Sequence, residues 1–247
     1  MSRYLVSLVI CFFINLSLPH ASAGENSQLP QQSILIMGDS ISAGFGIDGN
    51  FLFFWANPFG NYNMYKYDVI NGLFVDSFSA TASAVSAYYA KSSNKYIYAN
   101  TWSSSALAKT TGFNSAVSPL STNSLSGIKT ISFNASSGTV YAFSDNSGLL
   151  YAGADGGSFS TLFDFDPVRQ NLYINNVCYY KNDQFIATVN GQIITCKIAP
   201  DFQDIKSYTD LGNVDVLSLS TNGTDIWVYV MDYNTYLYEY RKITLKD

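Results

Sequence analysis

The stretch NDQFIATVNG, residues 182–191, places an apolar strand between two turn signals, and the same pattern occurs five times in the chain. The other copies are GNFLFFWANP at 49–58, SNKYIYANTW at 93–102, SGTVYAFSDN at 137–146 and GTDIWVYVMD at 223–232. Successive copies begin 44, 44, 45 and 41 residues apart. Each copy opens with small or polar residues and becomes apolar at its fourth position, which indicates a repeated supersecondary unit.

The sequence around residues 182–191 predicts the strands of one complete unit. Asn190-Gly191 between two apolar runs is a strong hairpin signal, because both residues tolerate positive φ. The expected strands of this unit cover residues 174–180, 184–189, 192–198 and 202–211. Four antiparallel strands in every 40 to 45 residues or so is the spacing of a β-propeller blade.

Positions four to six of every copy are apolar, unlike a strand with one face in solvent. They are Leu52, Phe53, Phe54, Tyr96, Ile97, Tyr98, Val140, Tyr141, Ala142, Phe185, Ile186, Ala187, Ile226, Trp227 and Val228. This pattern indicates sheets covered on both faces, as when blades pack against blades. The first strand of each unit instead carries small residues, which suit strands that converge near an axis: Gly44, Gly46, Ser132, Ser218 and Ser220.

The last unit contains only three expected strands, at residues 214–221, 226–231 and 235–243, before the sequence ends at Asp247. An apolar strand, Ser33 to Met37, has no place in the first unit. Letting this strand complete the last blade removes two exposed sheet edges. We therefore expect an all-β, five-bladed β-propeller, formed by residues 33–247 as one domain and closed by the N-terminal strand.

The first 23 residues resemble a secretory signal peptide. They contain Arg3, an apolar run from Leu5 to Leu18, and the small-residue cleavage pattern Ala21-Ser22-Ala23. The apolar run is shorter than the roughly 20 residues that a spanning helix needs, so we expect cleavage and no membrane span afterwards. Residues 24–32 would form a linker, and the mature protein would be secreted or periplasmic.

Charge and composition limit the partners and the chemistry. Cleavage removes His20, the only histidine, and leaves twelve basic residues against eighteen acidic ones. An acidic chain without a basic stripe predicts no nucleic-acid partner. The mature chain keeps two arginines, too few for the arginine triad of a sialidase. Asp164 and Asp166 are the nearest paired carboxylates, and we interpret them as part of a solvated loop before Pro167 rather than as a glycosidase pair.

We expect no metal and no cofactor. Without histidine, and with Cys178 and Cys196 as the only mature thiols, zinc and copper have too few ligands. Asp145 and its neighbours lack the remaining ligands of a calcium loop. The two cysteines fall on the first and third strands of one blade, about 9.6 Å apart by strand spacing, which is too far for a disulfide. Both are therefore predicted to be free, buried thiols.

Two short stretches resemble known families. The stretch LLYAGADGGSFS, from Leu149, is similar to the repeats of secreted BNR/Asp-box-like propellers, with Phe159 near the place of the missing tryptophan. In those families the motif is structural and implies no activity. Residues 34–44, ILIMGDSISAG, resemble block I of the SGNH/GDSL hydrolases, and this resemblance implies a serine nucleophile at Ser40 and an α/β fold. The family's GxND and DxxH blocks are absent, and a serine without a base in reach is a poor nucleophile.

Sequence alone thus favours a non-catalytic binding module for a glycan or a protein, expected to be monomeric. The alternatives are an SGNH/GDSL-type serine esterase or thioesterase using Ser40 and a structural envelope component without a ligand. In a propeller the turns between second and third strands share a face with the blade connections, and aromatic rings beside Asn and Asp suit ligand contact. The candidate ligand-binding residues in these turns are Phe59, Asn61, Trp102, Asp145, Asn146, Asn190, Asp232 and Tyr233. Asn134 and Asn222 begin glycosylation sequons, which matter in a eukaryotic source.

Overall fold

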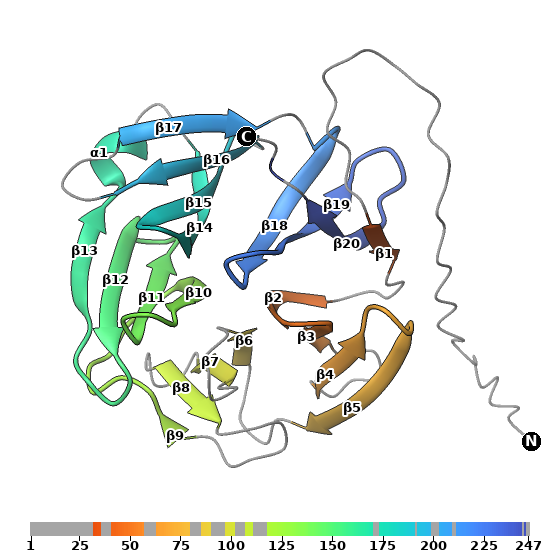
Figure 1. Ribbon diagram of the computed structural model, residues 1–247, viewed down its shortest axis with the longest axis horizontal. Helices are drawn as coiled ribbons and strands as arrows, with labels where there is room; N and C mark the ends of the chain where they lie inside the picture. Colours follow the sequence, from red (N-terminus) through yellow and green to blue (C-terminus); the bar gives the residue numbers. More distant parts are fainter. Residues whose placement is uncertain are drawn as a thin grey trace, which may run out of the picture.

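The computed structural model describes residues 32–35, 41–56, 63–79, 85–89, 97–101, 107–110, 118–169, 173–190, 192–198, 203–208, 211–243 and 245. These residues form five four-stranded antiparallel sheets. Figure 1 shows the sheets around a common centre, each with one strand on the inside and one on the outside. We call them sheets 1 to 5 in their order around this centre.

Sheets 1 to 3 each contain four strands that are consecutive in the chain and pair in that order. Sheet 1 consists of β2 (Ile41–Asp48), β3 (Phe51–Ala56), β4 (Asn63–Asp68) and β5 (Leu73–Ser79). Sheet 2 consists of β6 (Val85–Tyr89), β7 (Ile97–Thr101), β8 (Leu107–Thr110) and β9 (Ser118–Pro119). Sheet 3 consists of β10 (Ile128–Asn134), β11 (Thr139–Ser144), β12 (Leu149–Ala154) and β13 (Ser160–Asp164).

Sheet 4 continues this pattern, whereas sheet 5 combines the two ends of the chain. Sheet 4 consists of β14 (Ile174–Lys181), β15 (Gln184–Val189), β16 (Gln192–Lys197) and β17 (Gln203–Tyr208). Sheet 5 consists of β18 (Val214–Thr221), β19 (Ile226–Asp232), β20 (Tyr238–Ile243) and β1 (Gln32–Leu35). The fourth strand of sheet 5 therefore comes from the opposite end of the sequence.

The first strands of the sheets lie nearest the centre in Figure 1 and contact one another in a closed cycle. The contacting pairs are β2 with β6, β6 with β10, β10 with β14, β14 with β18, and β18 with β2. Three of these strands skip one residue in their pairing at the same place, namely Lys129, Asn175 and Leu217. The units that repeat in the sequence therefore share a backbone irregularity, a β-bulge at the same position of the first strand.

Small polar side chains join neighbouring first strands. The Thr130 hydroxyl in β10 donates to the Val177 carbonyl in β14 at 2.7 Å. The Asn175 amide in β14 donates to the Val216 carbonyl in β18 at 3.0 Å. The expected small residues Ser132, Ser218 and Ser220 are buried in the same region. Short side chains let the strands converge, and the Ser132 hydroxyl accepts from the Tyr179 N–H of the next first strand at 2.7 Å, whereas the buried Ser218 hydroxyl has no partner among the described residues.

The core consists of apolar clusters between adjacent sheets, and alternate residues of a middle strand enter different clusters. Phe185 and Ala187 of β15 pack in the cluster shared with sheet 3, whereas Ile186 packs in the cluster shared with sheet 5. In β19, Val228 faces sheet 4 and Trp227 faces sheet 1. This confirms that the all-apolar columns arise because the sheets are covered on both faces.

The contact between sheets 5 and 1 is rich in aromatic rings. The Tyr240 ring of β20 lies 4.9 Å from the Phe45 ring and 5.5 Å from the Phe54 ring, between centroids. On the other side, β1 pairs antiparallel with β20, so that Ile34 lies opposite Tyr240. Strand β1 begins at Gln32, one residue earlier than expected, and the expected strand residues Ile36 and Met37 lie outside the described residues. Strand β20 begins at Tyr238 rather than at residue 235, because residues 233–237 form a turn.

Two further expectations can be compared with the structure. Cys178 in β14 and Cys196 in β16 are free and buried, with β15 between their strands, as predicted. The loop expected around Asp164 and Asp166 was wrong in part, because α1 (Asp166–Arg169) is a one-turn helix. The Asp164 carboxylate accepts from the Asp166 N–H at 2.9 Å, and a proline in the first turn needs no N–H partner. Among the described residues, no helix has the length and apolar character to cross a membrane.

Candidate ligand-binding face

One end of the sheets carries the turns between second and third strands and the segments that lead into the first strands. Alternation of antiparallel strands puts both kinds of segment at the same end. Two hydrogen bonds join them directly: Asn190 N–H donates to the Tyr173 carbonyl, and Tyr233 N–H donates to the Asn213 carbonyl, each at 3.0 Å. We call the described part of this end the loop face: residues 145–148, 190 and 233–237, with lead-in residues 127, 173 and 211–213.

The turn of sheet 3 contains the candidates Asp145 and Asn146. The Asp145 carboxylate is 3.2 Å from the Lys129 ammonium, a partly exposed ion pair. The Asn146 side chain lies against Gly127, where a Cβ would be 2.8 Å from the Asn146 amide nitrogen. Gly127 also has a φ of +65°, so both the lack of space for a Cβ and the backbone conformation favour glycine at this position. Both candidates thus fix the turn to the start of β10.

The turn of sheet 4 holds an exposed tyrosine through the candidate Asn190. The Asn190 side-chain oxygen accepts from the Tyr173 N–H at 2.9 Å, and the Asn190 N–H donates to the Tyr173 carbonyl. Asn190 has a φ of +50°, a conformation that asparagine tolerates better than most residues. Its amide therefore positions Tyr173, which precedes β14 and is 60% exposed.

The turn of sheet 5 is closed by the candidate Asp232. Its carboxylate accepts from the Asn234 N–H at 2.8 Å and from the Thr235 N–H at 3.3 Å. Its backbone accepts from the Tyr236 N–H at 2.7 Å and donates to the Leu237 carbonyl at 3.0 Å. These bonds fix the turn and leave the rings of its two tyrosines outside.

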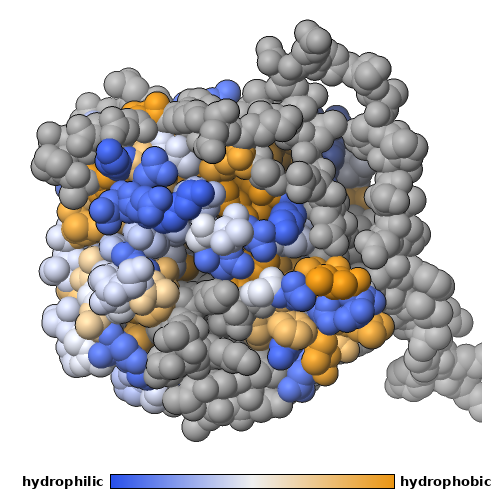
Figure 2. Space-filling model, in the orientation of Figure 1, coloured by the Kyte–Doolittle hydropathy of each residue, from blue (hydrophilic) through white to orange (hydrophobic). Residues whose placement is uncertain are grey.

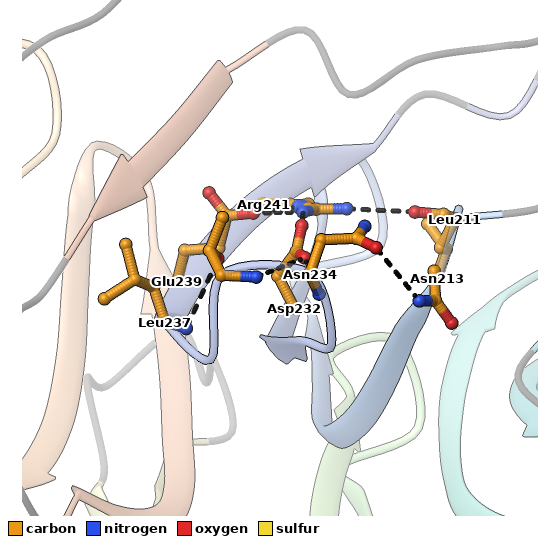
Figure 3. Close-up of polar contacts among 8 residues, drawn as sticks. Leu211, Asn213, Asp232, Asn234, Leu237, Glu239 and Arg241 are labelled. Carbon is orange, nitrogen blue, oxygen red and sulfur yellow. Dashed lines mark hydrogen bonds and ion pairs between the residues drawn. The ribbon is translucent and has the colours of Figure 1, made fainter.

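Figure 3 shows the Arg241 side chain of β20 between Glu239, Asp232 and the backbone of Leu211. Its guanidinium donates to the Leu211 carbonyl at 2.9 Å and lies 3.3 Å from the Asp232 carboxylate. It also forms an ion pair with Glu239, two residues earlier in the strand. Side-chain exposure is 11% for Arg241, so its charge is largely enclosed by these partners. Its position is structural, because it joins the turn to the start of sheet 5.

Exposed tyrosines distinguish the loop face from the packed sides of the sheets. Tyr236 is 73% exposed, Tyr173 60% and Tyr233 45%. Tyr236 has a φ of +56°, which is rare for an aromatic residue and costs about 1 kcal/mol or more. The backbone of the turn imposes this conformation, and the ring makes no contribution to the apolar clusters.

The remaining candidates cannot be placed. Ser40, Phe59, Asn61 and Trp102 lie outside the described residues. Among the residues that are described, no group of three or more His, Cys, Asp or Glu side chains could hold a metal ion. The α/β fold implied by the resemblance around Ser40 is not found, because the described strands form antiparallel sheets.

Sequence reasoning missed Tyr173, Tyr236 and Arg241 as parts of this face. Tyr236 was assigned to a strand beginning at residue 235, where alternating tyrosines look like strand residues. The Asp-Tyr-Asn-Thr run at 232–235 was the available signal, because Asp and Asn close turns through their side chains. Tyr173 carries no local signal, since only its bonds to Asn190 place it here.

The Asp-box-like stretch belongs to the opposite end of the sheets, between β12 and β13. Gly156 N–H donates to the Leu120 carbonyl at 2.7 Å. The Asn123 side chain bonds the backbone of Phe159 twice, at 2.8 and 2.9 Å, and the Phe159 ring covers Gly153. These contacts attach the hairpin to the segment between sheets 2 and 3. The residues of the motif therefore serve packing in this chain.

A second exposed surface lies on sheet 1. Its apolar residues occupy the β4–β5 turn and the outer strand β5, and they are Ile70, Leu73, Phe74 and Val75, between 45% and 65% exposed. Figure 2 shows apolar side chains, in orange, gathered over this part of the molecule. The patch is separate from the loop face, and the Asp68 carboxylate and the Asn71 side chain within it are bonded to each other in the β4–β5 turn.

Comparison with solved structures identifies the fold. A chain of a nidogen/laminin complex aligns with a TM-score of 0.52 and 12% identity, over 80% of this chain and 78% of that one. The Cps50 (Swd1) β-propeller domain of Myceliophteria thermophila aligns with a TM-score of 0.52 and 10% identity, over 86% of this chain and 91% of that one. A catalytically inactive virginiamycin B lyase from Staphylococcus aureus, with quinupristin, aligns with a TM-score of 0.51 and 9% identity, over 94% of this chain and 88% of that one.

The chain therefore has a β-propeller fold. At 9 to 12% identity these similarities concern the fold alone, and the three structures belong to proteins of different function. No protein-family model and no curated protein sequence matches the chain. Its function has to be argued from its own residues.

Proposed function

We propose that the protein is an exported, non-catalytic propeller that binds a glycan or a protein ligand on its loop face. The observation that carries this proposal is the presentation of Tyr173, Tyr233 and Tyr236 on turns closed by hydrogen bonds. Tyr236 in addition has an unfavourable backbone conformation, and such outliers cluster at functional sites such as ligand clamps.

Preorganisation supports the same proposal. The turn at 233–237 is held by Asp232, Arg241 and Asn213 before any ligand arrives. Ordering a flexible loop on binding costs about 0.5–1.5 kcal/mol for each immobilised side chain, and a fixed turn avoids much of this cost. A turn that is fixed in this way is suited to binding a ligand.

The architectural part of the proposal is a monomeric ring of five blades, closed where β1 joins β20. The cyclic contacts among the first strands and the pairing of Gln32 with Lys242 support it. Export to the periplasm or the cell exterior, after cleavage of residues 1–23, is proposed from the sequence of that segment. Intact-mass measurement of the protein recovered from the growth medium or the periplasm tests the cleavage directly.

The proposed function is tested by capturing ligands with the purified protein and with a Tyr233→Ala/Tyr236→Ala variant. The screen covers a glycan array and extracellular proteins of the source organism. We expect a captured ligand to bind the variant at least about tenfold more weakly. Phe74→Ala is the matched control, because Phe74 is also 45% exposed but lies in the patch on sheet 1.

Two results would contradict the proposal. One is a ligand that binds the tyrosine variant and the unmodified protein equally well. The other is hydrolysis of p-nitrophenyl esters that disappears in Ser40→Ala, which would replace the binding module by the esterase. In both cases the melting temperature of each variant is measured, so that unfolding is not mistaken for loss of function.

A further inference from the structure

The three exposed tyrosines of the loop face belong to neighbouring sheets. Tyr173 directly precedes β14, and Tyr233 is bonded to Asn213, which directly precedes β18. The strands β14 and β18 contact each other and are joined by the bond from Asn175 to Val216 near the same ends. The tyrosines of sheets 4 and 5 therefore flank one junction between two sheets.

Resting on the proposed function, we propose that Tyr173, Tyr233 and Tyr236 form a stacking platform for a neutral oligosaccharide. Sugar rings carry apolar C–H faces that pack on aromatic rings, and their hydroxyls need polar partners at the ring edges. Tyrosine supplies both, because its ring is apolar and its phenol can donate and accept.

Amide groups stand beside the platform to bond hydroxyls. The Asn213 side-chain nitrogen donates to the Asn234 side-chain oxygen at 3.2 Å, and both side chains are exposed. This bond leaves the Asn213 oxygen as an acceptor and the Asn234 nitrogen as a donor. The pair thus supplies one acceptor and one donor for sugar hydroxyls, which both donate and accept.

Charge indicates that the sugar is neutral. The cations that adjoin the turns of sheets 3 and 5 are already paired, Lys129 with Asp145 and Arg241 with Asp232 and Glu239. A uronate, sulfate or sialate would need a cation in addition, and it would approach a chain with net charge −5. A neutral sugar needs no additional cation and is not repelled by the negative net charge of the chain.

A protein partner fits these turns less well. The centre of a protein interface is typically apolar and depleted of charged residues, with a polar rim around it. Here the exposed rings stand among Asn213, Asn234 and Thr235 with one exposed aliphatic side chain, Leu237, whereas four exposed apolar side chains gather elsewhere, on sheet 1. A protein ligand is therefore treated as a contrary outcome of the test.

Isothermal titration calorimetry of the purified protein provides the test. The probes are neutral hexasaccharides of glucose, xylose, mannose, galactose and N-acetylglucosamine, with hexagalacturonate as the anionic probe. We expect at least one neutral probe to bind and hexagalacturonate to bind more than tenfold more weakly. Tyr236→Ala and Tyr173→Ala should each weaken binding about tenfold, whereas Tyr236→Phe should retain most of it, because the ring face remains. Leu162→Ala, in the outer strand of sheet 3, is the control and should bind normally.

The outcomes separate this inference from the proposed function. Binding of hexagalacturonate alone, or of a protein through the same tyrosines, would overturn the neutral-sugar assignment while the binding module stands. Binding of no neutral probe would also overturn the assignment. A ligand that binds Tyr173→Ala and Tyr236→Ala as tightly as the unmodified protein would contradict both. Near-ultraviolet circular dichroism of each variant excludes misfolding as the reason for a loss.

Discussion

Two buried tyrosines between sheets 5 and 1 have hydroxyls without a hydrogen-bond partner in the described structure. Tyr229 and Tyr240 are fully buried and lie opposite each other on β19 and β20, with ring centroids 4.7 Å apart. Removing a buried, unpaired hydroxyl removes its desolvation penalty. Tyr240→Phe should therefore raise the free energy of unfolding by about 1 kcal/mol, measured by urea denaturation. Tyr238→Phe, at a partly exposed position, should change it little, and a destabilised Tyr240→Phe would mean that the hydroxyl has a partner.

The same tyrosines predict loss of stability in alkali. Burial raises the pKa of both Tyr229 and Tyr240 well above its ordinary value. Above pH 10 or so, the unfolded chain loses these protons while the folded chain retains them, so stability falls as pH rises. Each tyrosine contributes a slope of about 1.4 kcal/mol per pH unit in this window. Denaturation at several pH values should show a shallower slope for Tyr229→Phe/Tyr240→Phe, and an unchanged slope would contradict the burial of the phenols.

The thiols should be unreactive until the protein unfolds. Burial raises the pKa of Cys178 and of Cys196 to about 12, so little thiolate exists near neutral pH. In a Cys11→Ser chain, a thiol reagent at pH 8 should label neither cysteine in the folded protein and both in denaturant. Rapid labelling of the native protein, read by intact mass, would show that sheet 4 is not packed as described.

At the scale of elements, the hairpin between β12 and β13 predicts a specific steric effect. A Cβ on Gly153 would lie 2.6 Å from the Phe159 ring, and the ring is buried against sheet 2. Gly153→Ala should destabilise the protein by about 1–3 kcal/mol, because a packed core resists added volume. The cost should be smaller in a Phe159→Leu background, measured as a double-mutant cycle. Equal costs in both backgrounds would contradict this contact.

Strands were predictable where local residues define their ends. The turns at Asn182-Asp183 and at Asn190 have positive φ at every one of these residues, so their chemistry alone ends β14 and β15. The start of β20 was misplaced because the alternating tyrosines outweighed the local turn signal of Asp232, and because the support from Arg241 is a contact that the sequence does not show. The positions of Asp145, Asn190 and Asp232 at turns were likewise predictable. Their roles in fixing the exposed tyrosines depend on tertiary hydrogen bonds and were not.

At the scale of the molecule, the account depends on a ring of sheets in which the chain begins and ends in the same blade. The sequence predicted this from a missing last strand and an unused first one, which is an argument about sheet edges rather than about local propensity. In the described part of the chain, apolar clusters are buried between sheets 2 and 3, 3 and 4, 4 and 5, and 5 and 1, the last of them rich in aromatic rings. The loop face exists only if the ring fixes the sheets relative to one another.

Cross-linking β1 to β20 tests this closure most directly. Gln32 lies opposite Lys242 in the antiparallel pair, and facing residues of such strands are close enough for a disulfide. In a Cys11→Ser background, Gln32→Cys/Lys242→Cys should oxidise to an intramolecular disulfide in the folded protein, detected by intact mass and non-reducing electrophoresis. The control Ser33→Cys/Lys242→Cys joins two positions that are one residue out of register, and it should remain reduced because successive positions of a strand alternate between the two faces of a sheet. Failure of the first pair to link, or equal linking of both pairs, would contradict the closed ring.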